Sequence, residues 1–154
     1  MPLVHAPSGK RLKQGLLYEL EYLGPSESQS IEYAYNMQFN LEGRVFRLLS
    51  NSTNGEAGAE TRFHYHQQQD VVWAAYGGGK VMLGNLLAKV NPDGSLDVRY
   101  HQLNQAGEFM TGECHSIPEV LPDGRYRLHE KWRWSCGDGS SGESVVEELL
   151  QNET

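Results

Sequence analysis

A run of short segments with alternating apolar and polar residues, separated by turn signals, extends from Gly43 to the C-terminus. Each segment has the length and the β-branched and aromatic content of a strand, and the intervening Gly-, Asn- and Pro-rich stretches have hairpin spacing. Eight strands in succession without a long helical pattern favour an all-β fold, a single closed antiparallel up-and-down barrel. The expected strands are Arg44–Ser50, Thr61–Gln67, Asp70–Tyr76, Lys80–Val90, Ser95–Leu103, Phe109–Pro118, Arg125–Trp134 and Glu143–Leu150.

The charge of the chain narrows the range of partners. Its formal net charge is −7, which argues against a nucleic acid or an anionic membrane as partner, because both are bound by basic surfaces. No apolar run approaches the roughly 20 residues of a membrane-spanning helix, and no signal peptide is recognisable. We therefore expect a cytoplasmic protein, in which Cys114 and Cys136 stay reduced.

Residues 1–39 differ from the remainder in being rich in Ser, Pro, Gly and Gln. We expect them to form an N-terminal extension, partly disordered or docked, in front of a barrel domain at residues 40–154. Leu16–Leu23 is the one apolar stretch in the extension. It alternates well enough to favour a strand that docks on the barrel, with a short helix or a mobile arm as alternatives.

The phase of several strands can be read from their alternation. In Arg125–Trp134, basic residues occupy one face, whereas Glu130 shares the other face with Leu128, Trp132 and Trp134. We expect this second face to point into the barrel. A carboxylate there requires a partner, so Glu130 either makes a structural ion pair or hydrogen bond, with Arg99 or Tyr100 as candidates, or anchors a ligand.

Aromatic residues from several strands share the predicted inner face with Glu130. An eight-stranded barrel either fills its interior with side chains or holds one small ligand, and ligand sites combine apolar walls with a few polar groups. The same residues could equally form an ordinary core. The candidate ligand-binding residues are Phe63, Tyr65, Trp73, Tyr100, Glu130, Trp132 and Trp134.

His64 and His66 provide an alternative, because residues i and i+2 of a strand project from one face and can converge on a metal ion. Together with Asp70 and the flanking glycines they resemble the first motif of the cupins, although Asp stands where cupins carry Glu. The second cupin motif is absent. If Phe63 and Tyr65 face inward, both histidines face solvent, so we expect no bound metal and no other cofactor.

A longer series of motifs covers about two thirds of the chain. Its clearest parts are Phe63-His64-Tyr65-His66, Gly112-Glu113-Cys114-His115-Ser116 and the stretch from Pro118 to Trp134. This series resembles a family of small bacterial proteins that are often labelled N-acetylglutamate synthase. The resemblance implies an avidin-like or calycin-like barrel. An acetyltransferase would need a glycine-rich loop that opens a helix to hold coenzyme A, and the sequence contains neither, so we expect no acetyltransferase activity.

These observations favour a protein that binds a small, partly apolar ligand in the mouth of a barrel, and they favour binding over catalysis. A cupin-type metal-dependent enzyme that uses His64, His66 and Asp70 is the first alternative. A structural module without a ligand is the second. A homo-oligomer is compatible with each of these functions.

Overall fold

The computed structural model describes residues 11–14, 18–21 and 39–153. In the first two ranges, β1 (Arg11–Gln14) and β2 (Tyr18–Glu21) form an antiparallel two-stranded sheet. The centre of the Leu16–Leu23 segment is therefore a strand, as the alternation favours. The rest of that segment lies outside the described residues, and the expected docking or disorder of residues 1–39 stays a prediction.

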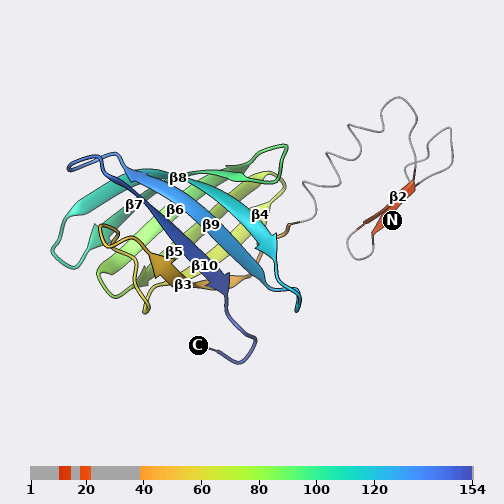
Figure 1. Ribbon diagram of the computed structural model, residues 1–154, viewed down its shortest axis with the longest axis horizontal. Helices are drawn as coiled ribbons and strands as arrows, with labels where there is room; N and C mark the ends of the chain where they lie inside the picture. The colour runs from red at the N-terminus through yellow and green to blue at the C-terminus, as the bar shows by residue number, and fades with distance from the viewer. Residues whose placement is uncertain (1–10, 15–17, 22–38, 154) are drawn as a thin grey trace. The chain divides into compact units, whose positions relative to one another are not determined.

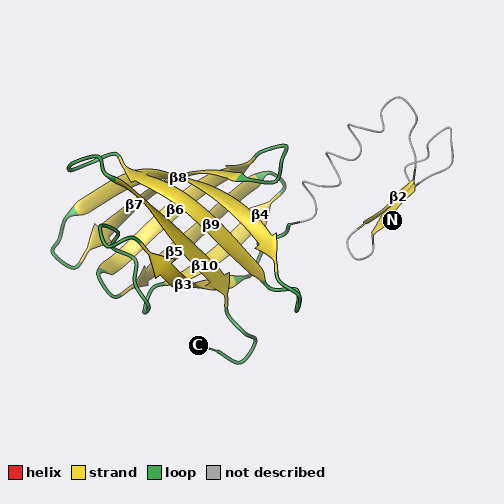
Figure 2. Ribbon diagram, in the orientation of Figure 1, coloured by secondary structure: helices red, strands yellow, loops and turns green. Residues whose placement is uncertain are grey.

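Eight further strands form a closed barrel in which each strand pairs with its neighbours in the chain and β10 pairs with β3. Figures 1 and 2 show the strands wrapping around one interior. The predicted all-β, antiparallel up-and-down barrel is confirmed, and the described residues contain no helix that could span a membrane. The strands are β3 (Val45–Asn51), β4 (Arg62–Gln68), β5 (Val71–Gly78), β6 (Val81–Val90), β7 (Leu96–Asn104), β8 (Phe109–Val120), β9 (Tyr126–Trp134) and β10 (Ser141–Glu148).

Tight turns at the two Pro-Asp-Gly sequences, residues 92–94 and 122–124, end strands at one end of the barrel. Gly94 and Gly124 have φ angles of 86° and 90°, a region that glycine enters without steric cost. Their N–H groups donate 2.9 Å hydrogen bonds to the carbonyls three residues earlier, at Asn91 and Leu121. The turn residues thus fix where β6 and β8 stop.

The half of the interior near these turns is filled by large apolar side chains. Phe46, Val72 and Leu128 are completely buried, and the ring of Phe46 packs edge-on against Tyr65 with centroids 5.1 Å apart. Leu41 is buried nearby, where its N–H donates to Gln67 near the end of β4. Each of these side chains contributes about 1.5–3 kcal/mol through burial, so this end of the barrel is a packed core.

Charged side chains dominate the outside of the barrel, and one group of them crosses the seam where β10 meets β3 and β9. The carboxylate of Glu147 is 2.6 Å from Arg127, 3.5 Å from Arg125 and 3.6 Å from Arg47. Glu147 is almost fully covered, and the hydrogen bond from Arg127 is the main reason that its pKa is lowered.

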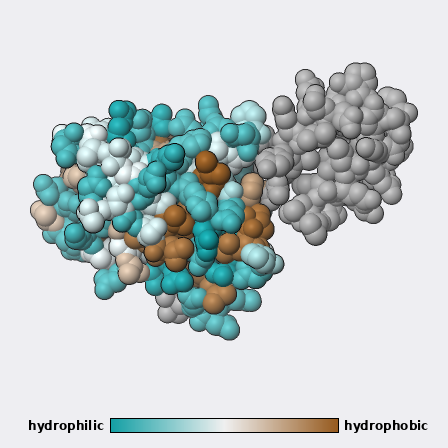
Figure 3. Space-filling model, viewed as in Figure 1, coloured by the Kyte–Doolittle hydropathy of each residue, from teal (hydrophilic) through white to brown (hydrophobic). Residues whose placement is uncertain are grey.

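Apolar residues gather on one part of the otherwise hydrophilic wall in Figure 3.

Candidate functional site

Three aromatic rings narrow the other half of the barrel, and each lies against a glycine of the neighbouring strand. In every case the ring occupies the space that a Cβ on that glycine would need. Glycine therefore permits a large ring to lie flat against the inner wall. The cross-strand pairs are Tyr76–Gly84, Tyr100–Gly112 and Trp132–Gly142.

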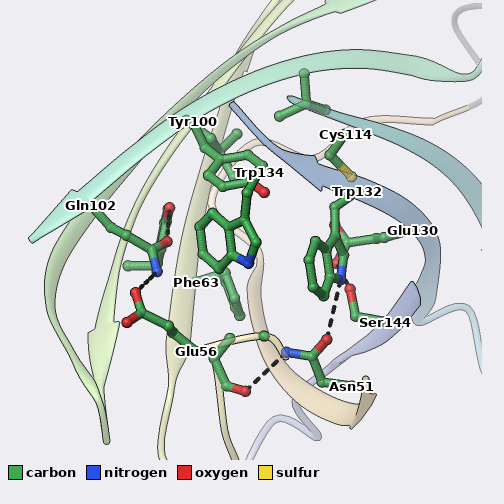
Figure 4. A pocket seen from close by; sticks show the side chains of 15 residues that line it. Asn51, Glu56, Phe63, Tyr100, Gln102, Cys114, Glu130, Trp132, Trp134 and Ser144 are labelled. Atoms are coloured by element: carbon green, nitrogen blue, oxygen red, sulfur yellow. Dashed lines mark hydrogen bonds between the residues drawn. The ribbon is translucent and has the colours of Figure 1, made fainter. Parts of the chain in front are cut away.

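A cavity lies between these rings at the end of the barrel that carries the β3–β4 loop (Figure 4). The cavity has a volume of about 70 Å³, which is enough for about five to seven water molecules. Its wall is mostly aromatic and aliphatic, with polar groups concentrated at two places. The lining residues include Phe63, Tyr76, Leu86, Val98, Tyr100, Gln102, Cys114, Glu130, Trp132, Trp134 and Ser144.

Both interior tryptophans hold the β3–β4 loop across the cavity. Trp132 Nε1 donates a 3.2 Å hydrogen bond to Asn51 Oδ1, and Trp134 Nε1 donates a 3.0 Å bond to the carbonyl of Asn54. Asn51 Nδ2 in turn donates to the carbonyl of Ala57 at 3.1 Å. A buried indole N–H needs an acceptor, and here Asn51 at the end of β3 and Asn54 in the loop supply them. Because Asn51 also holds Ala57, the loop and the aromatic wall are coupled.

Glu56 reaches from this loop to the far side of the cavity. Its two carboxylate oxygens accept hydrogen bonds of 2.8 Å from Gln102 Nε2 and Asn104 Nδ2, both on β7. The Gln102 amide oxygen accepts a 2.8 Å bond from the Tyr76 hydroxyl. The partners of Glu56 are amides and not cations, so its negative charge is hydrogen-bonded but not neutralised.

Glu130 is the second carboxylate in the cavity and lies between two serines. Ser116 on β8 and Ser144 on β10 are its direct cross-strand neighbours, and their hydroxyls donate to its two oxygens at 3.2 Å and 2.9 Å. Burial nevertheless raises the pKa of Glu130 to about 7, against the opposing effect of these two bonds. The carboxyl group is therefore poised to gain or lose a proton near neutral pH.

The other titratable groups near Glu130 are neutral under ordinary conditions. Burial is the main cause that raises the pKa of the Tyr65, Tyr76 and Tyr100 phenols and of the Cys114 thiol. The negative charge of Glu130 raises these pKa values further. Among the described residues that line the cavity there is no Lys, Arg or His, and the acidic residues are Glu56 and Glu130.

Of the predicted ligand-binding residues, Phe63, Tyr100, Glu130, Trp132 and Trp134 line the cavity. Tyr65 points inward but belongs to the packed half of the interior. Whether these residues bind a ligand stays a prediction, and the positions of the other candidates require corrections.

The prediction that Trp73 faces inward is wrong. Trp73 is 39% exposed on the outer wall, where its ring stacks on His66 with centroids 5.6 Å apart. β5 is apolar on both faces, and Val72, Ala74 and Tyr76 are the residues that point inward. Alternation of polarity therefore could not identify the phase of this strand.

Neither of the two candidate partners of Glu130, Arg99 for an ion pair or Tyr100 for a hydrogen bond, contacts it in this way. Arg99 lies on the outer wall, where it pairs with Asp97 at 2.7 Å, and Tyr100 makes no hydrogen bond with Glu130. The expectation that Glu130 faces inward and is hydrogen-bonded holds, but both of its partners are serine hydroxyls. Burial without a positive partner raises the pKa of this carboxyl group, whereas an ion pair would lower it.

The metal-site alternative has no structural support. His64 and His66 are exposed on the outer wall, and His66 pairs with Glu42 at 3.2 Å. Asp70 lies exposed in the β4–β5 turn, and the described part of the chain contains no cluster of three or more His, Cys, Asp or Glu that could hold a metal ion. The outward phase expected for the two histidines is confirmed.

Sequence reasoning missed Glu56 and the two serines that hold Glu130. Glu56 lies in a loop without periodicity, so no alternation indicates its direction. Ser116 and Ser144 each lie 14 residues from Glu130, and pairing the predicted hairpins residue by residue could have brought them together. The sequence does contain one signal for the rings that pack closely against the wall. Glycines occur inside the strands at positions 84, 112 and 142, and a glycine within a strand often marks such a close approach.

The comparisons with known proteins agree with this geometry. The family model described as "Avidin-like protein" matches residues 39–149, which include every strand of the barrel. No curated protein sequence and no solved structure matches the chain. Since the family model covers well over half of the sequence and the matched residues form a closed eight-stranded barrel, the chain belongs to the avidin-like family.

Proposed function

We propose that this protein binds a small, partly apolar ligand inside the barrel. The observation that carries the proposal is the cavity itself, because one half of the interior is packed and the other half is not. An aromatic wall with a few polar groups at fixed positions is the usual composition of a ligand site. A structural module without a ligand would have no need of a hollow interior.

The size of the cavity limits the ligand. A space for about five to seven waters suits a compact molecule with about that many non-hydrogen atoms. Such a ligand would contact the Trp132 and Trp134 rings and would come within reach of the carboxyl group of Glu130. The β3–β4 loop, held directly by the indole N–H of Trp134 and through Asn51 by that of Trp132, would cover it.

The three tryptophans provide a direct test. Two lie inside the barrel, and Trp73 lies outside, so the ¹⁵N–¹H signals of the indoles report separately on the interior and the outer wall. The full chain would be titrated with small neutral compounds such as cyclopentanol, pyrrolidin-2-one and phenol. We expect saturable shifts of the Trp132 and Trp134 signals with the Trp73 signal unchanged.

A cavity-filling variant completes this test. Val98 lines the cavity and is buried, so Val98→Phe should abolish the shifts by occupying the space. Val71→Phe is the matched control, because Val71 is 48% exposed on the outer wall. The proposal is contradicted if no compound shifts an interior indole, or if Val98→Phe and Val71→Phe bind equally well.

A further inference from the structure

The charge inside the cavity is unbalanced. Glu56 and Glu130 line it on opposite sides in Figure 4, and none of the described lining residues is basic. Glu130 has two serine hydroxyls and Glu56 has two amides as partners, so each carboxylate is hydrogen-bonded without a counter-charge. Both side chains are half-buried, and a negative charge withdrawn from water is costly unless a cation is brought to it.

Aromatic rings from four strands surround the same space. Trp134 packs against Trp132 and Tyr100, with ring centroids 5.5 Å and 5.8 Å apart. On the opposite side, the centroids of Phe63 and Tyr76 are 4.9 Å apart. The faces of such rings attract alkylammonium groups, and a cage of several rings with a carboxylate is a recurrent way to bind them. Figure 4 shows Tyr100, Trp132, Trp134 and Glu130 projecting toward a common region.

We propose that the ligand of this cavity is a small organic cation of the alkylammonium class, with Glu130 as its counter-charge and the aromatic rings around its alkyl groups. The cation proposal rests on the proposed function, because a charge preference presupposes that the interior is a ligand site. The cavity would then distinguish ligands of similar shape by their charge. A cation would form an ion pair with Glu130. An anion would face two carboxylates, and a neutral isostere would leave Glu130 as it is.

Binding of a cation is coupled to the proton on Glu130. The raised pKa of about 7 means that the empty site holds a proton on this group below neutral pH, and the cation must displace it. The phenol and thiol groups packed around Glu130 stay neutral, because burial raises the pKa of Tyr65 on β4, Tyr76 on β5, Tyr100 on β7 and Cys114 on β8. Glu56 in the β3–β4 loop is the second carboxyl group of the cavity lining.

Three probes of nearly equal shape test the charge preference on the full chain. Choline is a cation at every pH, 3,3-dimethylbutan-1-ol is its neutral carbon isostere, and 3,3-dimethylbutanoate is an anion. The Kd of each probe would be measured at pH 8 from the indole signals of Trp132 and Trp134. We expect choline to bind at least tenfold more tightly than the alcohol and the anion to give no saturable shift.

The pH dependence then identifies the residue responsible. The Kd for choline should weaken by about tenfold per unit as the pH falls below 7 and should level off above it, whereas the Kd of the alcohol should stay constant. Glu130→Gln should remove the preference for choline together with its pH dependence and leave the alcohol within about twofold. Glu113→Gln, which removes a carboxylate from the outer wall, should behave like the unaltered protein.

Each failure has a distinct meaning. If neutral compounds bind in the interior but choline does not exceed its isostere, the cation proposal is wrong and the proposed function stands. If choline is preferred but Glu130→Gln, shown by circular dichroism to be folded, keeps that preference, the assigned counter-charge is wrong. If no compound of any charge shifts an interior indole, the proposed function fails and the cation proposal fails with it.

Discussion

Trp132 lies directly opposite Gly142 across the β9–β10 pair, and its indole ring fills the space that a Cβ at position 142 would occupy. Gly142→Ala must therefore displace the ring or the strand, and overpacking of this kind costs about 1–3 kcal/mol of the free energy of unfolding. Chemical denaturation followed by tryptophan fluorescence would measure the loss.

Gly58→Ala is the control for this prediction. Nothing lies within 4 Å of a Cβ at position 58, and the φ angle of Gly58 is not positive, so the change should stay within about 0.5 kcal/mol. Equal losses in the two variants would mean that the ring of Trp132 does not depend on the missing side chain at Gly142.

The absence of a cation beside Glu130 predicts how stability depends on pH. Its pKa is about 7 in the folded protein, against an ordinary 4.5, so between these values the folded state holds a proton that the unfolded chain has released. The contribution of this group to the free energy of unfolding therefore falls by about 3 kcal/mol as the pH rises from about 4.5 to 7.

Glu130→Gln should abolish that dependence, because a neutral amide can keep both serine partners and has no charge to bury. Relative to the unaltered protein, the variant should gain stability as the pH rises from 5 to 8, in contrast to the loss expected for a residue in an ion pair. Urea unfolding at several pH values would measure this gain. Parallel pH profiles for the two proteins would contradict it.

Much of the barrel was predictable from the sequence because its strands alternate clearly and its turns contain Gly, Asn and Pro at hairpin spacing. All eight predicted strands lie within two residues of the observed bounds. The inward phase of Glu130, Trp132 and Trp134 followed from the basic residues on the opposite face of β9. A one-residue slip would have reversed both faces, so this pattern determines the register strongly.

The site itself was only partly predictable, since it depends on contacts between strands and on a loop. Trp73 was misplaced because both faces of β5 are apolar. The serine partners of Glu130 depend on the registers of two hairpins, and the position of Glu56 depends on how the β3–β4 loop folds over the cavity. None of these is encoded in the periodicity of a single segment.

Glu147 should contribute to stability in the opposite pH range from Glu130. Removing its charge with Glu147→Gln leaves Arg127, Arg125 and Arg47 without their shared carboxylate, and loss of charged hydrogen bonds at a covered site costs about 1.5–3 kcal/mol. Because the pKa of Glu147 is lowered, its contribution is present above the ordinary pKa of a Glu and is lost as the pH falls below it.

Glu113→Gln again offers a matched control. Glu113 is 2.7 Å from Arg133, but both side chains are largely exposed, and exposed pairs contribute about 0–1 kcal/mol. Thermal unfolding at several pH values from 7 downward should therefore separate the two variants at pH 7 and bring them closer together as the pH falls through the lowered pKa of Glu147. If Glu113→Gln lowered the Tm as much as Glu147→Gln does, burial of the ion pair would not be the cause of its contribution to stability.

Residues 1–36 should be dispensable for the barrel. The eight strands from Val45 to Glu148 satisfy one another's edges by pairing β10 with β3, and a closed barrel has no free edge for another strand to cover. Leu41, which is buried at the packed end, is retained in a chain that begins at Met37. Such a chain should stay soluble and unfold cooperatively in a thermal melt, with a Tm within a few degrees of the full chain. An unfolded or aggregating product would instead mean that the N-terminal residues are an integral part of the fold.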